Sequence, residues 1–181
     1  MILWPRRQEG VSTSTARPAA EEFADFVHAT GGALFRTALL LTGDHHLAED
    51  LTQTTYARVF ASWRRVSRAD NPAAYARRVL LNGFISHRRL RRNAETPTST
   101  LPDDPGSDAD PSARIDLLAA LQRLSPTDRA VLVARYWEDR SVFQTAADLG
   151  LTETAVRTRS KRALERLRPL VADIFPERTT R

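Results

Sequence analysis

Apolar residues recur at intervals of three and four along most of the chain, and no long stretch alternates apolar with polar residues. This spacing predicts helices throughout and an all-α fold. The first helix is expected to include Phe23 and Leu39 and to be loosened at Gly31-Gly32. It should end at Gly43-Asp44, because glycine commonly follows a last helical turn.

A second helix is expected from about Leu47 to Arg64. Its apolar residues cover more than half of its circumference and leave one narrow polar arc, which contains Asp50, Gln53 and Ala57. Such an arc can face either a partner or water. On helical spacing alone, the solvated arc is the simpler interpretation.

Arginine dominates the third predicted helix, which begins at Asn71-Pro72, with asparagine as the N-cap and proline in the first turn. It extends to about Arg92 and contains no acidic residue. Its six arginines are Arg77, Arg78, Arg88, Arg89, Arg91 and Arg92. Uncompensated like charges on one helix repel each other, so a bound polyanion would stabilise it. We therefore favour phosphate binding over a merely solvated helix.

The C-terminal part of the sequence contains the same kinds of helix start and stop signals. Helices are expected to begin after Asp110, Ser125, Ser141 and Thr152, and the last one is expected to end at Pro169.

A helix-turn-helix is expected between the last two of these helices. Ala146 lets the helices approach, Gly150 takes the turn conformation, and Val156 packs back between them. The second helix then exposes hydroxyls and cations, as a recognition helix in a major groove does. These outward residues are Thr154, Arg157, Thr158, Lys161 and Arg162. Ordinary helical hairpins can show the same spacing.

Charge divides the chain into three parts. Residues 1–92 carry 14 arginines against 8 acidic residues, residues 93–111 carry five acids and no base, and residues 112–181 carry 13 bases against nine acids. The middle segment contains four prolines and no aromatic residue, which is typical of a linker. We therefore expect a disordered extension (1–19), a first small domain (20–92), a flexible acidic linker (93–111), a second small domain (112–176) and a tail (177–181).

Several functional classes find no support in the sequence. The absence of cysteine excludes disulfides and cysteine-ligated metal sites. No apolar run could span a bilayer and no signal peptide is recognisable, so a soluble cytoplasmic protein is expected. His45-His46 lies beside acidic residues, but adjacent histidines at a helix start are expected to point apart, so no metal site and no cofactor are predicted. No acid is set in an apolar run as a catalytic carboxylate would be, so we do not expect an enzyme.

Three segments, in a fixed order, point to a family. AEDLTQTTYARVFASW (48–63), NPAAYARRVLLN (71–82) and LSPTDRAVLVARYWEDRS (124–141) precede the helix-turn-helix. Together they resemble bacterial RNA polymerase sigma factors of the extracytoplasmic-function type (sigma-70 family, group 4), over roughly residues 20–169. The resemblance implies that 20–92 is sigma region 2, which binds core polymerase and the −10 element. It implies that 112–176 is sigma region 4, which binds the −35 element.

The resemblance also assigns roles to individual positions. The clamp helices of the largest polymerase subunit would be contacted by Glu49, Asp50, Leu51 and Gln53. The −10 element would be bound by Arg68, Asp70, Asn71, Arg77, Arg78, Arg88 and Arg89. The −35 element would be read through Thr154, Arg157, Thr158, Arg159, Lys161 and Arg162. The polar arc of the second helix then becomes a partner surface rather than a solvated one.

The implied function is promoter recognition, promoter melting and transcription initiation together with core RNA polymerase. The polymerase flap is an expected partner of the C-terminal domain, and an anti-sigma factor is a partner whose existence the sequence leaves open. The chain departs from the family pattern at Thr54, Tyr75 and Ser160, where many members have Glu, Trp and an apolar residue. The sequence leaves two alternative functions open. One is a stand-alone helix-turn-helix regulator that binds its operator without polymerase, and the other is an interaction protein that binds polymerase without opening promoters.

Overall fold

The computed structural model describes residues 19–92 and 111–171, and every element in these ranges is a helix, which confirms the all-α class. The helices are α1 (Ala19–Thr42), α2 (His45–Ala61), α3 (Trp63–Val66), α4 (Pro72–Arg92), α5 (Pro111–Gln122), α6 (Pro126–Leu132), the π-helix η1 (Val133–Trp137), α7 (Val142–Leu149) and α8 (Glu153–Val171). The predicted extension, linker and tail lie outside the described residues, except that Ala19 begins α1 and Pro111 begins α5.

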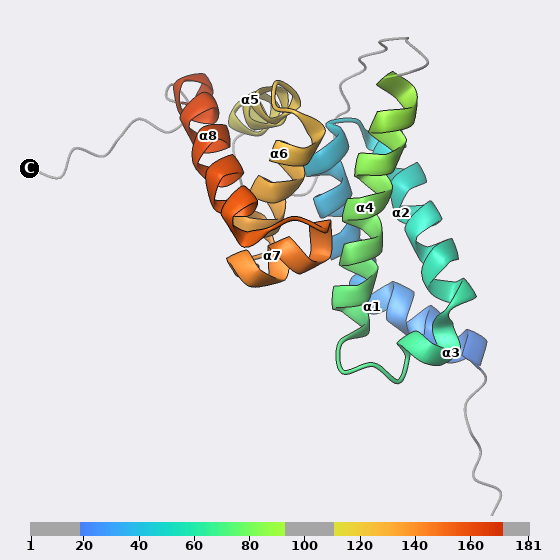
Figure 1. The fold of residues 1–181 in the computed structure, drawn as a ribbon. Coiled ribbons are helices and arrows are strands. Elements are labelled where there is room, and N and C mark those ends of the chain that lie inside the picture. Colours follow the sequence, from blue (N-terminus) through green and yellow to red (C-terminus); the bar gives the residue numbers. More distant parts are fainter. Residues whose placement is uncertain (1–18, 93–110, 172–181) are drawn as a thin grey trace, which may run out of the picture.

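Helices α1 and α2 form an antiparallel hairpin, and α4 packs against both of them (Figure 1). The turn between α1 and α2 follows from two residues: Gly43 has a φ of 69°, and the Asp44 carboxylate accepts a hydrogen bond of 2.8 Å from the backbone N–H of Leu47. The expected loosening at Gly31-Gly32 is wrong, because α1 continues through both glycines. Extensive packing against α2 keeps the helix regular there.

An aromatic cluster closes the open end of this hairpin. Phe23 near the start of α1 packs against Phe60 and Trp63, with ring centroids 4.8 and 5.1 Å apart. Tyr56 adds its ring to the cluster, and its hydroxyl lies 2.8 Å from the Thr30 hydroxyl. Burial raises the pKa of the Tyr56 phenol, and the hydrogen bond with Thr30 partly offsets that increase. Aromatic packing therefore holds the start of α1 against α2 and α3.

The second predicted helix differs from the structure in two ways. It ends at Ala61 rather than Arg64, because the chain breaks at Ser62 and restarts as α3. Its buried face is also not the large apolar one that was expected. The fully buried residues are Ala48, Thr52, Thr55 and Val59, and Phe60 remains half exposed. The two threonine hydroxyls donate hydrogen bonds to the carbonyls four residues earlier, so these small polar residues can line a close helix contact.

The predicted caps account for the helix starts of the C-terminal block. The Ser125 hydroxyl accepts a hydrogen bond from the N–H of Asp128, and Ser141 and Gln144 form a complete capping box. Gly150 takes the left-handed conformation with φ 64°, and the Thr152 hydroxyl caps α8 at 3.1 Å from the N–H of Ala155. The prediction that the last helix ends at Pro169 is wrong by two residues, because α8 continues to Val171 with the proline inside it.

A π-helical turn, η1, follows α6 where the sequence predicted an ordinary helix. The N–H of Glu138 bonds to the Val133 carbonyl five residues earlier, at 3.0 Å. This wider turn holds one more residue than an α-helical turn does. The insertion sets the direction in which Glu138 leaves the helix.

The two halves of the chain share a hydrophobic core, and the buried residues of a second, smaller cluster all lie in the C-terminal half. Buried residues Leu34 and Leu80 from the first half belong to the same cluster as Val131 and Val156 from the second. In Figure 1, α6 and α7 lie beside α1 and α4; both of them pack against α4, and α6 also packs against α1. The sequence predicted two tethered domains and gave no sign of this packing.

Arg129 on α6 provides the polar link between the halves. Its side chain is 2% exposed, and its guanidinium donates to the Leu41 carbonyl near the end of α1 and to the side-chain oxygen and the carbonyl of Gln122. The guanidinium carbon also lies 5.7 Å from the centroid of the Phe84 ring on α4. One arginine thus joins α1, α4 and the α5–α6 connection.

Two glycines should respond in opposite directions to the same substitution. Gly31→Ala places a methyl in the middle of α1, where the nearest neighbouring atom is the Tyr56 hydroxyl at 3.8 Å, and should stabilise the protein by about 0.5–1 kcal/mol. Gly150→Ala meets no neighbouring atom but forces a Cβ into φ 64°, and should cost about 1 kcal/mol or more. Urea unfolding of the full chain measures both, and changes of the same sign would contradict this explanation.

Ser160 on α8 is a second position with a defined expectation. The residue is 7% exposed, and its hydroxyl has no hydrogen-bond partner within the described part of the chain. Ser160→Ala should therefore raise the free energy of unfolding by about 0.5–2 kcal/mol, since a buried unpaired hydroxyl is costly. The reciprocal variant Ala163→Ser, at a position 1% exposed on the same helix, should lower the unfolding free energy. A neutral result for both variants in thermal unfolding would refute the assignment.

Candidate nucleic-acid interface

The helix-turn-helix predicted from the sequence is present in α7 and α8. Ala146 is 7% exposed, Val156 is fully buried, and the N–H of Leu151 bonds to the Ala146 carbonyl at 2.9 Å. These contacts hold the start of α8 against α7. The opposite face of α8 is exposed, and it contains Thr154, Arg157, Thr158, Lys161 and Arg162.

Arg159 is the exception among the predicted residues of this helix. Its guanidinium lies 2.7 Å from the Asp128 carboxylate on α6, whose second oxygen lies 3.8 Å from the guanidinium of Arg166. Arg159 therefore ties α8 to α6 through Nη1, while 41% of its side chain remains exposed. Arg157 pairs with Glu153 of its own helix, at 2.7 Å, and both side chains are well exposed. An exposed pair of this kind is weak and exchanges easily for a phosphate or a base edge.

The predicted polymerase contacts lie on α2, but they do not all face outward. Asp50 and Gln53 are exposed and Glu49 is partly exposed. Leu51 instead belongs to the packing of the core, and its Cδ1 approaches Gly83 on α4. The outward surface is therefore polar and acidic, with Leu51 supporting it from behind.

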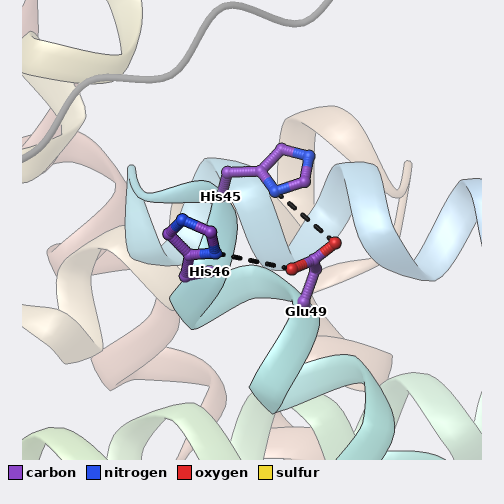
Figure 2. A group of neighbouring side chains, drawn as sticks. All are labelled: His45, His46 and Glu49. Atoms are coloured by element: carbon purple, nitrogen blue, oxygen red, sulfur yellow. Dashed lines mark ion pairs between the residues drawn. The ribbon is translucent and has the colours of Figure 1, made fainter.

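The histidines at the start of α2 do not point apart as expected. The Nδ1 atoms of His45 and His46 each lie 3.6 Å from a different oxygen of the Glu49 carboxylate. Figure 2 shows both rings turned toward that carboxylate. The expectation was wrong because one ring reaches Glu49 across four positions and the other across three, which are both neighbouring distances on a helix.

The predicted −10 residues are divided between the loop before α4 and the two ends of that helix. Arg68, Asp70 and Asn71 are exposed, and the Asn71 side chain caps α4 by accepting the N–H of Ala74 at 2.8 Å. Arg78 is exposed. Arg88 and Arg89 lie in α4, but their side chains fall outside the described part of the structure.

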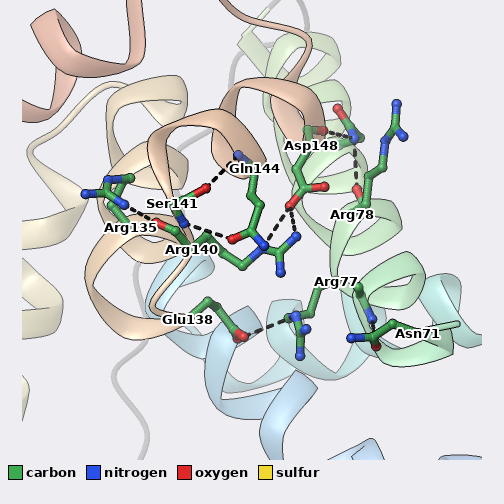
Figure 3. A network of polar contacts seen from close by, with 11 residues as sticks. Asn71, Arg77, Arg78, Arg135, Glu138, Arg140, Ser141, Gln144 and Asp148 are labelled. Atoms are coloured by element: carbon green, nitrogen blue, oxygen red, sulfur yellow. Dashed lines mark hydrogen bonds and ion pairs between the residues drawn. The ribbon is translucent and has the colours of Figure 1, made fainter. Parts of the chain in front are cut away.

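Arg77 faces the C-terminal block instead of solvent (Figure 3). Its Nε lies 3.4 Å from the Glu138 carboxylate, with both side chains largely buried, although the geometry there is not that of a hydrogen bond. We take the contact as a charge pair. The other Glu138 oxygen accepts the Thr37 hydroxyl of α1. Glu138, at the end of η1, therefore bridges two helices of the first half, α1 and α4.

Two further contacts belong to the same network. The Asn82 amide on α4 donates to the Asp148 carbonyl on α7 at 2.8 Å, and the Asp148 carboxylate pairs with Arg140 at 3.3 Å. Sequence reasoning missed Glu138, Asn82 and Asp148, because each depends on a partner far away in the chain.

No helix within the described residues is long and apolar enough to cross a membrane.

Comparison with known families agrees with the order of these elements. Residues 26–94 match sigma-70 region 2, and residues 120–169 match sigma-70 region 4. The RNA polymerase sigma-E factor of Streptomyces coelicolor is 38% identical over 149 residues, which cover 81% of this chain and 84% of that protein. The ECF RNA polymerase sigma factor SigL of Mycobacterium tuberculosis is 34% identical over 145 residues, which cover 75% of this chain and 80% of that protein.

Solved structures agree on the fold. The sigma factor RpoE from Bartonella quintana, crystallised with the anti-sigma factor NepR, superposes with a TM-score of 0.70 at 24% identity and covers 83% of this chain and 97% of that one. CnrH, solved with the cytosolic domain of CnrY, gives a TM-score of 0.59 at 23% identity, covering 85% and 90% of the two chains. With both sigma regions matched in order and relatives well above 30% identity, the chain belongs to the sigma-70 family of RNA polymerase sigma factors, as a member of its extracytoplasmic-function type.

Proposed function

We propose that this chain binds core RNA polymerase, directs it to promoters through their −10 and −35 elements, and takes part in promoter melting and initiation. The observation that carries the proposal is the exposed face of α8. It presents the arginines, lysine and hydroxyls expected of a recognition helix, on a helix-turn-helix whose packing leaves that face free. Arginine side chains suit guanine edges and phosphates, and threonine hydroxyls suit phosphates.

The first half would bind the −10 element through the loop before α4. Arg68, Asp70 and Asn71 are exposed and lie close together in the sequence. Arg78 is exposed in the first turns of α4. This arrangement suits a separated DNA strand, since arginines can hold its phosphates while the polar loop contacts a base. Arg88 and Arg89 would extend the phosphate contacts along α4.

Polymerase binding would use the outward side of α2. Glu49, Asp50 and Gln53 form its acidic and polar surface, and Leu51 fixes the helix against α4. Lysine and arginine are both absent from residues 37–57, although the chain as a whole is rich in arginine. The surface therefore suits a positively charged partner. It does not suit nucleic acid, which is negatively charged.

We propose that the chain has no catalytic activity of its own. We also propose that it acts in the cytoplasm, where polymerase acts. An anti-sigma factor is a further proposed partner, because the similar sigma factor RpoE of Bartonella quintana was crystallised in complex with the anti-sigma factor NepR.

Binding of the −10 element requires Arg77 to change partners. In the packed arrangement its guanidinium is held against Glu138, and Asn82 holds the adjoining turn of α4 against α7. We expect these contacts to break when the chain binds polymerase and DNA, so that the two halves separate while segment 93–111 still connects them.

Run-off transcription tests the proposed function. Core polymerase on a broad promoter library should initiate only when the chain is added, whereas a stand-alone regulator would bind duplex DNA and leave transcription unchanged. Asp50→Arg should weaken polymerase binding at least tenfold and remove the run-off product, because it places a cation on the acidic surface of α2. Asp116→Arg, the same charge reversal at an exposed position of α5, is the matched control and should retain activity. Failure of the wild-type chain across the library would overturn the proposal.

Glu138→Gln should release Arg77 while it preserves the shape of the side chain. We expect the affinity of the full chain for a labelled, mixed-sequence single-stranded DNA to rise about three- to tenfold, the effect of losing a partly buried charge pair worth roughly 1 kcal/mol. Asp148→Asn is the matched control, because Asp148 is equally buried and equally charged but pairs with Arg140 inside the C-terminal block. Equal gains for the two variants in fluorescence anisotropy would mean that net charge alone is responsible.

A further inference from the structure

His45, His46 and Glu49 form a compact cluster at the start of α2 (Figure 2). One ligand atom of each residue lies within 4.8 Å of the other two. Two imidazole nitrogens and a carboxylate oxygen are the donor set that Zn²⁺ and similar borderline divalent cations take in proteins with an open coordination position.

The distances are close to those of a loaded site. With metal–ligand bonds of about 2.0–2.2 Å and tetrahedral angles, two ligand atoms lie roughly 3.3–3.5 Å apart. The Nδ1 atom of His45 lies 3.6 Å from one Glu49 oxygen, and that of His46 lies 3.6 Å from the other. To share one cation, the two imidazoles must move closer to each other and to a common carboxylate oxygen. His46 can supply that movement, because its side chain is 88% exposed.

His45 is held in place by its surroundings. Its ring packs edge-on against Phe35 of α1, with centroids 5.0 Å apart, and less than a third of its side chain is exposed. Its position four residues before Glu49 places both on one face of the helix. The site therefore combines one fixed imidazole, one mobile imidazole and a carboxylate, so that binding orders few additional atoms.

The local charge also favours a cation. Asp44, Glu49 and Asp50 all lie within the first turns of α2 or at its cap, and no lysine or arginine occurs between positions 37 and 57. The positive end of the helix dipole opposes a cation at this place. Three carboxylates outweigh that half-charge, and the Asp44 carboxylate already faces the helix N–H groups as the N-cap.

We propose that His45, His46 and Glu49 bind one borderline divalent cation of the Zn²⁺ class, with at least one coordination position left to solvent or to a partner. The donors are two neutral imidazoles and one carboxylate, so the bound cation adds a net positive charge to a surface that is otherwise acidic. The other two histidines of the chain, His28 and His87, lie on α1 and α4 and are not part of this cluster.

A cation bound at this site would change the charge of the polymerase-binding surface on α2. This consequence rests on the proposed function. Glu49 belongs to that surface, and a metal ion would both occupy its carboxylate and reverse the charge beside Asp50. Metal binding and polymerase binding should therefore oppose each other, and by linkage each should weaken the other by the same factor.

Titration of the untagged, EDTA-treated full chain with Co²⁺ tests the site without polymerase. We expect one equivalent to produce the visible absorption of a four- or five-coordinate cobalt centre, which Zn²⁺ then displaces. His46→Ala and Glu49→Gln should each weaken binding at least tenfold, and both are mild changes at solvent-accessible positions that leave the fold intact. His87→Ala, which removes an exposed histidine from α4, should bind like the wild type. The absence of a one-equivalent transition, or equal losses in the His46 and His87 variants, would overturn the proposal.

Polymerase affinity of the labelled chain, measured with and without Zn²⁺, tests the coupling. Zn²⁺ should weaken binding of the wild-type chain at least fivefold and leave that of His46→Ala unchanged. An equal effect on both chains would come from zinc acting on polymerase and would overturn the coupling. A chain that binds cobalt but never binds polymerase would reject the sigma-factor proposal and leave the metal site standing.

Discussion

The packing of the two described halves against each other depends on one buried cation, Arg129. The Arg129 guanidinium has almost no contact with solvent, so its charge must be compensated by oxygen atoms inside the protein. Those oxygens come from the Leu41 carbonyl near the end of α1 and from Gln122 and Leu124 before α6. The C-terminal end of a helix carries partial negative charge, which makes the last turn of α1 a favourable place for this cation. The C-terminal block cannot leave α1 without breaking the bond from this arginine to the Leu41 carbonyl and exposing its guanidinium to water.

The shared core around Arg129 explains why the described halves pack together. Leu34 and Leu80 of the first half lie in one buried cluster with Val131 of the second, so separating the halves would return apolar surface to water. Hydrophobic contact and the buried arginine therefore act together, whereas the Glu138 contacts lie nearer the surface. Any opening that promoter binding requires must supply enough new contact to replace this core.

Local signals made much of the fold predictable. Asn71, Ser125, Ser141 and Gly150 each mark a helix boundary through hydrogen bonds or backbone conformation within a few residues, and each boundary is where the sequence placed it. The errors have a different origin. The break at Ser62, the continuous path of α1 through its glycines and the π-helical turn leave no mark in helical periodicity, which records only which face of a helix is apolar.

The candidate site shows the same division. Exposure of Arg157, Thr158 and Lys161 follows from their spacing on α8, so the sequence could place that face. The partners of Arg77 and Arg159 could not be read from sequence, because Glu138 and Asp128 lie on other helices and many residues away. The convergence of His45 and His46 needed actual side-chain positions, since adjacent residues on an ideal helix point about 100° apart.

The number of residues in the π-helical turn η1 determines which residues Glu138 contacts. Because η1 contains one residue more than an α-helical turn, everything after Trp137 is rotated by about 100° relative to a regular helix. That rotation is what brings Glu138 to Thr37 and Arg77. Loss of a single codon within Val133–Trp137 would turn the carboxylate away from both residues without changing any of the three. In related proteins, the number of residues in this turn is therefore as informative as their identity about whether the two halves are locked together.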